Sequence, residues 1–271
     1  MAPIRHCTPV HMCRGSHMRY IIAIVVALFG LITYYSTSTD NAVTGEKQHV
    51  KLTASQEVTL GRQLAPQMAA QFGGLFGDQA AADQVRRVGA EVVSRSAAAK
   101  TPYQFNFHLL ADRRTVNAFA LPGGQVFITE ALRSRLKNDD ELAAVLGHEV
   151  GHVLARHSAE HLAKQQLTQM MVGAVVIGSG GGYDTAQLAQ MVGGLVTMKH
   201  SRDDELEADS LGLRLMQEAG HDPRAMIGVM QTLESASGGG RQPEFASTHP
   251  NPGNRIARIK EQLAKMPPKQ G

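Results

Sequence analysis

The sequence predicts a mainly helical α+β fold in which a small mixed β-sheet lies among amphipathic helices. Apolar residues recur at a spacing of three and four over residues 53–72 and 80–99, the period of an amphipathic helix. Between residues 104 and 129 the period changes to two in short β-prone runs, which predicts a small, mostly antiparallel sheet. A chain of 271 residues with 43% hydrophobic content can bury one large core or two small ones.

An apolar run near the N-terminus, residues 20–35, is typical of membrane targeting because arginines precede it and tyrosines stand at both ends. It is interpreted as an uncleaved anchor; a cleaved signal and a buried soluble helix are the alternatives, since roughly 20 residues span a bilayer. The preceding arginines place the body on the non-cytoplasmic side. The expected organisation is an N-terminal extension (1–19), this segment, a linker (36–52) and one domain (53–267).

Charge and cysteine usage exclude several classes of protein. Three of the 27 basic residues precede the apolar run, so 24 remain to balance 24 acidic residues. A neutral body argues against a nucleic-acid partner. Both cysteines, Cys7 and Cys13, also precede the run, which leaves the body without a thiol for a disulfide or a cysteine-ligated zinc site.

Helical patterns resume after the sheet region. Asn138 opens a polar N-cap cluster before a long helix that includes residues 141–161. Further helices are expected at about 201–220, 223–236 and 254–265, the last with Asn254 as its N-cap.

Residues 167–198 contain a single charged residue, Asp184. Their apolar blocks are too short to span a bilayer, so we interpret them as two packed helices joined by a glycine-rich turn. A second membrane contact and an adaptable groove for unfolded clients are the alternatives.

The stretch ELAAVLGHEVGHVLARHSAEH, residues 141–161, contains the first candidate metal ligands. His148, Glu149 and His152 form H-E-x-x-H, and at 100° per residue they share one narrow face of a helix. Two imidazoles four residues apart can bind one zinc ion, and the carboxylate between them can take a proton from water at the open coordination position. The motif therefore predicts one Zn²⁺ per chain, with Glu149 as the general base.

A second set, His157, Glu160 and His161, spells H-x-x-E-H, the inverted zinc-protease motif. On one continuous helix these residues point away from the first set, so the two sets cannot share an ion. The surrounding helix is charged and polar, which suits a partly solvated face. The first set is preferred because H-E-x-x-H includes its own base.

A catalytic zinc needs a third protein ligand, and the stretch SRDDELEADSLG, residues 201–212, contains several carboxylates. H-E-x-x-H followed by E-x-x-A-D resembles the zincin peptidase family of the CAAX prenyl proteases, the heat-shock membrane protease and the periplasmic β-barrel-assembly-enhancing proteases. The resemblance implies a zincin-like (minigluzincin) core, Glu205 as the third ligand, and Asp209 as the residue that orients a ligand imidazole. Glu207, on the other side of that helix, is expected to be solvated.

Two further stretches extend the resemblance over residues 52–265. NAFALPGGQVFITEAL implies that an edge strand, comprising Asn117, Ala118, Phe119 and Ala120, faces the active-site helix and pairs with extended substrate; an ordinary core strand is the alternative. STHPNPGNRIARI implies His249 as an inhibitory fourth ligand and Arg255 as a partner of the tetrahedral oxyanion. The alternatives are a surface histidine and a solvated helix residue.

The expected function is that of a zinc-dependent endopeptidase that cleaves extended or misfolded polypeptides at the bacterial cell envelope, in protein quality control. Its body is expected in the periplasm, anchored to the inner membrane or released after signal cleavage. The competing interpretation is a membrane-tethered chaperone or binding module with a structural zinc site, although structural sites are closed and need no carboxylate beside the metal. A zinc hydrolase with another substrate is a third. The sequence does not indicate an oligomeric state.

Overall fold

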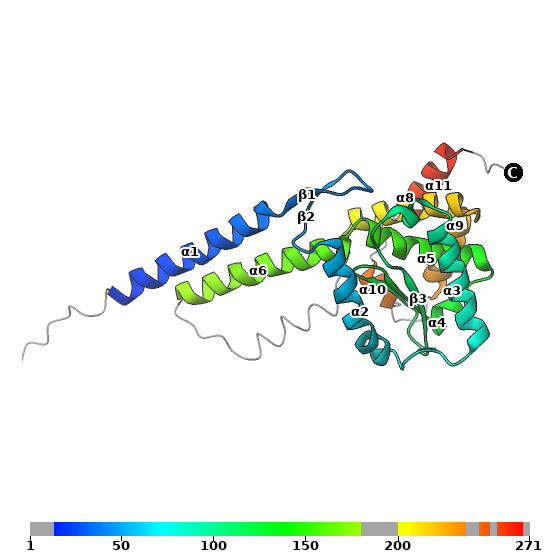
Figure 1. Cartoon of the computed structure of the whole chain (residues 1–271), viewed down its shortest axis with the longest axis horizontal. Helices are drawn as coiled ribbons and strands as arrows, with labels where there is room; N and C mark the ends of the chain where they lie inside the picture. The colour runs from blue at the N-terminus through cyan, green and yellow to red at the C-terminus, as the bar shows by residue number, and fades with distance from the viewer. Residues whose placement is uncertain (1–13, 180–199, 237–243, 250–253, 268–271) are drawn as a thin grey trace, which may run out of the picture. The chain divides into compact units, whose positions relative to one another are not determined.

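The structure, a computed structural model, describes residues 14–179, 200–236, 244–249 and 254–267. Figure 1 shows these elements along the chain. The N-terminal half contains α1 (Arg14–Ser36), β1 (Ser38–Asp40), β2 (Lys47–His49), α2 (Ala54–Gln71), α3 (Gln79–Ser94), η1 (Ala97–Lys100), β3 (Asn106–Leu110), β4 (Ala118–Leu121), β5 (Gln125–Thr129) and α4 (Glu130–Arg133). The rest contains α5 (Asp139–Leu154), α6 (His157–Ser179), α8 (Arg202–Ala219), α9 (Ala225–Ala236), α10 (Glu244–Thr248) and α11 (Arg255–Lys265). The predicted mainly helical α+β fold is confirmed.

The chain divides into two compact units. One contains residues 1–39, 47–50 and 160–197, and the other contains residues 40–46, 51–159 and 198–271. The units interleave along the sequence, whereas the boundaries expected above assign residues 53–267 to one domain; those boundaries stay a prediction.

The first unit is built on α1 and most of α6. In α1, residues His17–Ser36 are long and apolar enough to cross a membrane, with a mean hydropathy of 1.8. α6 packs against this helix at Gly30, where a Cβ atom would lie 3.3 Å from the Cβ of Met170. Further along α6, Met171 is 36% exposed and Val175 is 70% exposed, so this part of the expected core segment leaves apolar side chains uncovered. The second helix expected within 167–198 lies outside the described residues.

Polar caps set the starts of the helices in the second unit. Thr53 and Gln56 form a reciprocal capping box at α2, and Asp78 accepts hydrogen bonds from the first turn of α3. At α5 the side chain of Asn138 accepts from the Glu141 amide at 2.9 Å, as predicted. Asn254 does precede α11, but its side chain makes no capping hydrogen bond.

The main sheet has three strands in the order β3-β5-β4. β4 pairs with β5 antiparallel and β3 pairs with β5 in parallel, so the sheet is mixed, as the predicted fold class states, and the expectation that it is mostly antiparallel was wrong. Alternation with a period of two marks a strand without revealing the direction of its neighbour. The tight turn between β4 and β5 needs Gly123, which has a φ of 79° and approaches the Val58 backbone so closely that a Cβ atom would lie 2.3 Å away.

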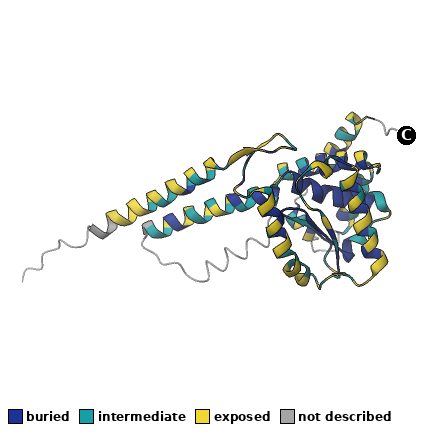
Figure 2. Ribbon diagram, in the orientation of Figure 1, coloured by how far each residue is buried: buried dark blue, intermediate teal, exposed yellow. Residues whose placement is uncertain are grey.

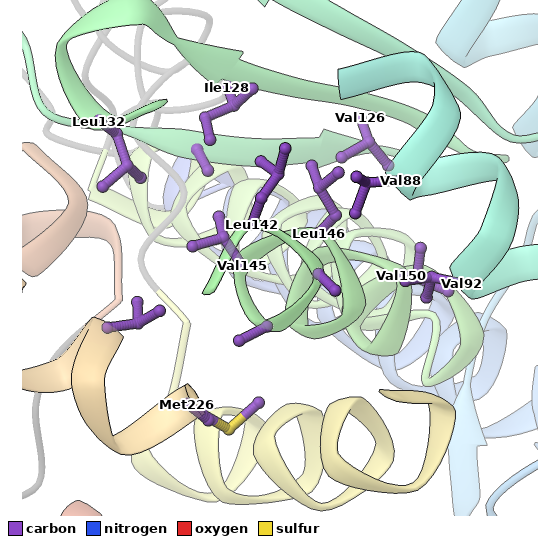
Figure 3. Packing of buried hydrophobic residues seen from close by; sticks show 14 of the residues in the cluster. Val88, Val92, Val126, Ile128, Leu132, Leu142, Val145, Leu146, Val150 and Met226 are labelled. Atoms are coloured by element: carbon purple, nitrogen blue, oxygen red, sulfur yellow. The ribbon is translucent and has the colours of Figure 1, made fainter. Parts of the chain in front are cut away.

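The core of this unit is centred on α5, which is buried from Glu141 to its end at Leu154 (Figure 2). Figure 3 shows Leu142, Leu146 and Val150 of α5 packed toward α3 and the sheet, while Met226 of α9 lies on another side of the helix. The same helix contacts α8 most extensively. A helix surrounded in this way carries apolar residues over most of its circumference, so its few polar side chains must find partners inside the protein.

The long helix expected over residues 141–161 is two helices. α5 ends at Leu154, Arg156 has a φ of 59°, and α6 begins at His157. This left-handed backbone is uncommon for a residue with a side chain. The Arg156 guanidinium donates to the buried Glu57 carboxylate at 2.9 Å and to the Leu52 carbonyl at 2.6 Å, and these contacts hold the break in place. Continuous-helix geometry therefore does not apply beyond residue 154.

Candidate active site

Small residues allow α5 and α8 to approach closely, which brings their polar side chains together. A Cβ atom on Gly151 of α5 would lie 2.9 Å from the carbonyl oxygen of Ala208 in α8. On the other helix, a Cβ on Gly212 would lie 3.1 Å from the amide nitrogen of His148. Since real side chains do not tolerate the first contact, the spacing of the two helices depends on these glycines.

The three residues expected to bind the metal meet at the contact between these helices. The Nε2 atoms of His148 and His152 are 3.1 Å apart. Glu205 of α8 places Oε2 3.5 Å from the first imidazole and Oε1 3.4 Å from the second. All three side chains are buried, and the structure thus joins ligands from two helices that are separated by about fifty residues in sequence.

This set of donors fits a zinc ion. Two imidazole nitrogens and one carboxylate oxygen form the ligand set of a catalytic zinc site that keeps one position open. Glu149 lies on the same turn as His148, and its buried Oε1 has no hydrogen-bond partner among the described residues. A buried carboxylate oxygen that no protein group satisfies fits a residue with a catalytic role. Burial also raises the pKa of Glu149, as expected for a general base.

Asp209 and Arg255 lie behind His148. Asp209 Oδ1 is 3.0 Å from His148 Nδ1, on the opposite side of the ring from the cluster. Arg255 donates two hydrogen bonds to the Asp209 carboxylate, from Nε at 2.6 Å and from Nη2 at 2.7 Å. Its Nη1 is 3.0 Å from Glu205 Oε2. Arg255 is only 2% exposed, so it is not a solvated helix residue. Its donors face carboxylates in this arrangement.

His249, which follows α10, lies directly at the cluster. Its Nδ1 is 2.9 Å from Glu205 Oε1 and 3.4 Å from His148 Nε2, and its Nε2 is 3.7 Å from Glu149 Oε1. The ring stacks on Phe245, with centroids 4.3 Å apart. Its ligand atom lies within 4.8 Å of those of His148, His152 and Glu205, so the side chain is not a surface residue.

Burial and neighbouring charged or hydrogen-bonding groups both shift the pKa values of the residues in this cluster. Burial lowers the pKa of His148, but hydrogen bonds to Asp209 and Glu205 outweigh this effect and raise it to about 9. For His152, burial and the nearby His200 lower the pKa well below its ordinary value. Burial would raise the pKa of Glu205, yet the surrounding histidines hold it far below its ordinary value, so the carboxylate stays charged.

Two residues that the sequence placed elsewhere also reach this cluster. His157 was expected to point away on a continuous helix, but the break at Arg156 brings its Nδ1 to 2.8 Å from His152 Nδ1. Glu207, expected to be solvated, lies 3.0 Å from His157 Nε2 with its side chain 28% exposed. His200 stacks on His152 with ring centroids 4.0 Å apart. No local sequence signal marks the helix break that makes the first contact.

The stretch expected to bind substrate forms the edge of the sheet. β4 runs from Ala118 to Leu121, with β5 on one side, and it contacts α5. Asn117 precedes the strand; its carbonyl accepts from the Thr129 amide at 3.0 Å, and its buried Oδ1 has no partner among the described residues. Because hydrogen-bonded and non-bonded positions alternate in an antiparallel pair, the backbone groups of Ala118 and Ala120 face away from β5.

Comparison with known proteins identifies the family. The model of peptidase family M48 matches residues 79–263, more than half of the chain. Mitochondrial metalloendopeptidase OMA1 of Schizosaccharomyces pombe is 39% identical over 163 residues, which are 59% of this chain and 47% of that protein. The β-barrel assembly-enhancing protease of Escherichia coli K12 is 30% identical over 228 residues, 80% of this chain and 46% of that protein. Metalloprotease YcaL of the same organism is 32% identical over 169 residues, covering 60% and 63%.

The chain spans about half the length of the first two relatives, and the family match includes every site residue from His148 to Arg255. The resemblance read from the H-E-x-x-H and E-x-x-A-D motifs is thereby confirmed. The chain belongs to peptidase family M48.

Proposed function

We propose that this chain is a zinc-dependent endopeptidase. The observation that carries the proposal is the convergence of His148, His152 and Glu205 beside Glu149, whose buried Oε1 has no hydrogen-bond partner among the described residues. The first three would hold the ion, which when bound supplies a Lewis acid for the attacking water and the scissile carbonyl. Family membership and the protease names of the relatives support the same reaction.

Glu149 and Asp209 have different roles in this proposed reaction. Glu149 takes the proton of the attacking water and passes it to the leaving amine, since a carboxylate with a raised pKa can both accept and return it. Asp209 accepts the Nδ1 proton of His148, which leaves Nε2 free for the metal. The test of this function is loss of proteolysis on replacing Glu149.

We assign β4 as the strand that binds an extended polypeptide. Its outward backbone groups at Ala118 and Ala120 would add the substrate as a further strand beside α5. Such pairing reads the backbone rather than side chains, so selectivity for sequence would be loose. Unfolded segments would fit this surface, because their backbone N–H and C=O groups are not already paired within a fold.

Ala120→Pro is expected to lower kcat/KM for an unfolded protein substrate by about 2- to 12-fold, the value of one hydrogen bond. Proline removes an N–H that faces the free edge and leaves the ladder to β5 intact. Ala120→Ser keeps the N–H and serves as the control. An unchanged kcat/KM in the proline variant, with the fold intact by circular dichroism, would make β4 an ordinary core strand.

We further assign His249 as a latch that occupies the open position of the site. Its Nδ1 faces Glu205 and His148 while Nε2 faces Glu149, so in this state the ring fills the space in which water and substrate carbonyl must react. Proteolysis then requires α10 and the residue after it to move.

His249→Ala is expected to raise proteolysis by about fivefold or more, because the free energy that couples a regulatory element to a site is typically 1–3 kcal/mol. Initial rates on an unfolded protein at saturating zinc measure the effect. Ser247→Ala, at an exposed position of the same short helix, should change nothing. Unchanged or lower proteolysis in the His249 variant would end the latch assignment.

The place of action that fits these features is a membrane surface of the bacterial envelope, with protein quality control as the role. α1 supplies the candidate anchor, and its apolar side chains are exposed in the structure. One relative is named for β-barrel assembly and another is mitochondrial. Resistance of the full chain to carbonate extraction from membranes would support an inserted α1, and complete release would contradict it.

A further inference from the structure

We propose that His157 and Glu207 are positioning residues that fix the tautomer of His152 and thereby hold its Nε2 lone pair toward the metal. The proposal rests on the zinc site of the proposed function, but it concerns two residues that the H-E-x-x-H and E-x-x-A-D motifs leave without a role.

A series of contacts runs from His152 through His157 to Glu207, away from the cluster. His152 has Nε2 at the ligand side, 3.1 Å from His148 Nε2 and 3.4 Å from Glu205 Oε1. Its other nitrogen, Nδ1, is 2.8 Å from Nδ1 of His157. The far nitrogen of His157, Nε2, is 3.0 Å from Glu207 Oε2. His157 is 2% exposed, so both ring nitrogens find their partners inside the protein.

The possible proton positions give this series of hydrogen bonds a single direction. A charged carboxylate can only accept, so Glu207 places the proton of a neutral His157 on Nε2. His157 Nδ1 is then an acceptor, and the short contact requires His152 to carry its proton on Nδ1. A neutral imidazole protonated there has its lone pair on Nε2, the atom that faces the other ligands. The opposite tautomer of His152 could not bind a metal through Nε2.

His148 and His152 thus have separate supports. The Nδ1 of His148 lies 3.0 Å from Asp209, which Arg255 holds in place. Among the described residues, the partner given for His152 Nδ1 is His157 rather than a carboxylate, and His157 in turn contacts the Glu207 carboxylate. Groups that hydrogen-bond to ligand imidazoles commonly change metal affinity by 10- to 100-fold when they are removed.

The break between α5 and α6 is what makes the contact. On a continuous helix, five residues would rotate His157 by about 140° from His152. The left-handed backbone of Arg156 instead returns the chain, and the contact of its guanidinium with Glu57 stabilises that conformation. Residues held in sparsely populated backbone conformations cluster at functional sites.

The test compares the zinc affinity of variants of the full chain in detergent, measured by competition with a chromophoric chelator after the metal has been stripped. His157→Leu removes the acceptor at similar volume and should weaken zinc binding by about 10- to 100-fold. His157→Asn keeps an acceptor oxygen near the position of Nδ1 and should restore binding to within about threefold of the unsubstituted chain. If His157 only filled space, His157→Asn would not bind zinc more tightly than His157→Leu, which is closer to histidine in volume.

Glu207→Ala provides a second measurement at a partly exposed position, where folding is not at risk. It should weaken zinc binding several-fold alone and add nothing in the His157→Leu background, because Glu207 acts through His157. His221→Leu is the control: this histidine is also buried and bonded to a carboxylate, Asp140 at 3.0 Å, so its loss should lower the melting temperature and leave zinc affinity unchanged.

Zinc affinity of Glu207→Ala equal to that of the unsubstituted chain, or equal weakening by His157→Leu and His157→Asn, would overturn the proposal. In both results the unsubstituted chain still binds zinc, so the proposed function stands. Failure of the unsubstituted chain to bind zinc at all is a different outcome, which removes the proposed function and this inference with it.

Discussion

Glu149→Gln is expected to lower proteolysis by about 10²- to 10⁴-fold, while zinc content and melting temperature stay at the level of the unsubstituted chain. Glutamine has nearly the same shape as glutamate but cannot accept the proton of the attacking water. The side chain is buried beside the candidate ligand imidazoles, and its Oε1 has no hydrogen-bond partner among the described residues, so the substitution removes a proton acceptor without breaking a hydrogen bond at that oxygen. Degradation of unfolded casein measures the rate, and metal analysis measures zinc.

Two controls separate the possible functions. Stripping zinc from the unsubstituted chain should abolish casein degradation, and adding zinc back should restore it. Full turnover by the Glu149→Gln variant would falsify the assignment of the base. A zinc-loaded, unsubstituted chain that binds unfolded casein without cleaving it would favour the tethered binding module instead.

Arg255→Ala is expected to destabilise the folded protein by about 3–5 kcal/mol and to weaken zinc binding. The guanidinium pairs with two buried carboxylates, those of Asp209 and Glu205, and its removal leaves their charges uncompensated. Burial would raise the pKa of Asp209, but the charge and hydrogen bonds of Arg255 keep it below its ordinary value, so the cation favours the charged carboxylate that orients His148. Urea unfolding and chelator competition give the two quantities.

Arg255→Lys and Arg258→Ala complete this experiment. Lysine keeps the charge but cannot form the two-pronged contact with Asp209, so an intermediate loss is expected. Arg258 lies on the same helix, exposed and paired with Glu261, and its removal should cost less than about 1 kcal/mol. Normal stability and zinc affinity with lost turnover in Arg255→Ala would instead assign Arg255 to the oxyanion of the reaction.

The parts of the structure that local patterns determine could be predicted from the sequence. α2, α8 and α9 follow the spacing of apolar residues, and Asn138 caps α5 because its side chain bonds within its own turn. The candidate metal site could also be predicted, because H-E-x-x-H places three side chains on one helix and the family resemblance implied the residues of α8. Such features depend on neighbours a few residues apart.

Contacts between distant segments set the remainder. The end of α5 depends on Glu57, about a hundred residues before Arg156, and that contact decides where His157 points. The direction of β3 relative to β5 depends on the path of the chain between them rather than on the alternation within each strand. The burial of Arg255 likewise depends on the packing of α11 against α8, which no local periodicity encodes.

The dependence of the site on α11 has a consequence for biosynthesis. Arg255 is 46 residues downstream of Asp209 and 107 downstream of His148. Ribosomes therefore complete both motifs well before they reach Arg255, which compensates the buried charges of Asp209 and Glu205. A nascent chain therefore contains the candidate zinc ligands without their compensating cation for several seconds at usual elongation rates of about 5–20 residues per second. The arrangement of buried charges described here is therefore complete only after α11 has been synthesised and has packed against α8.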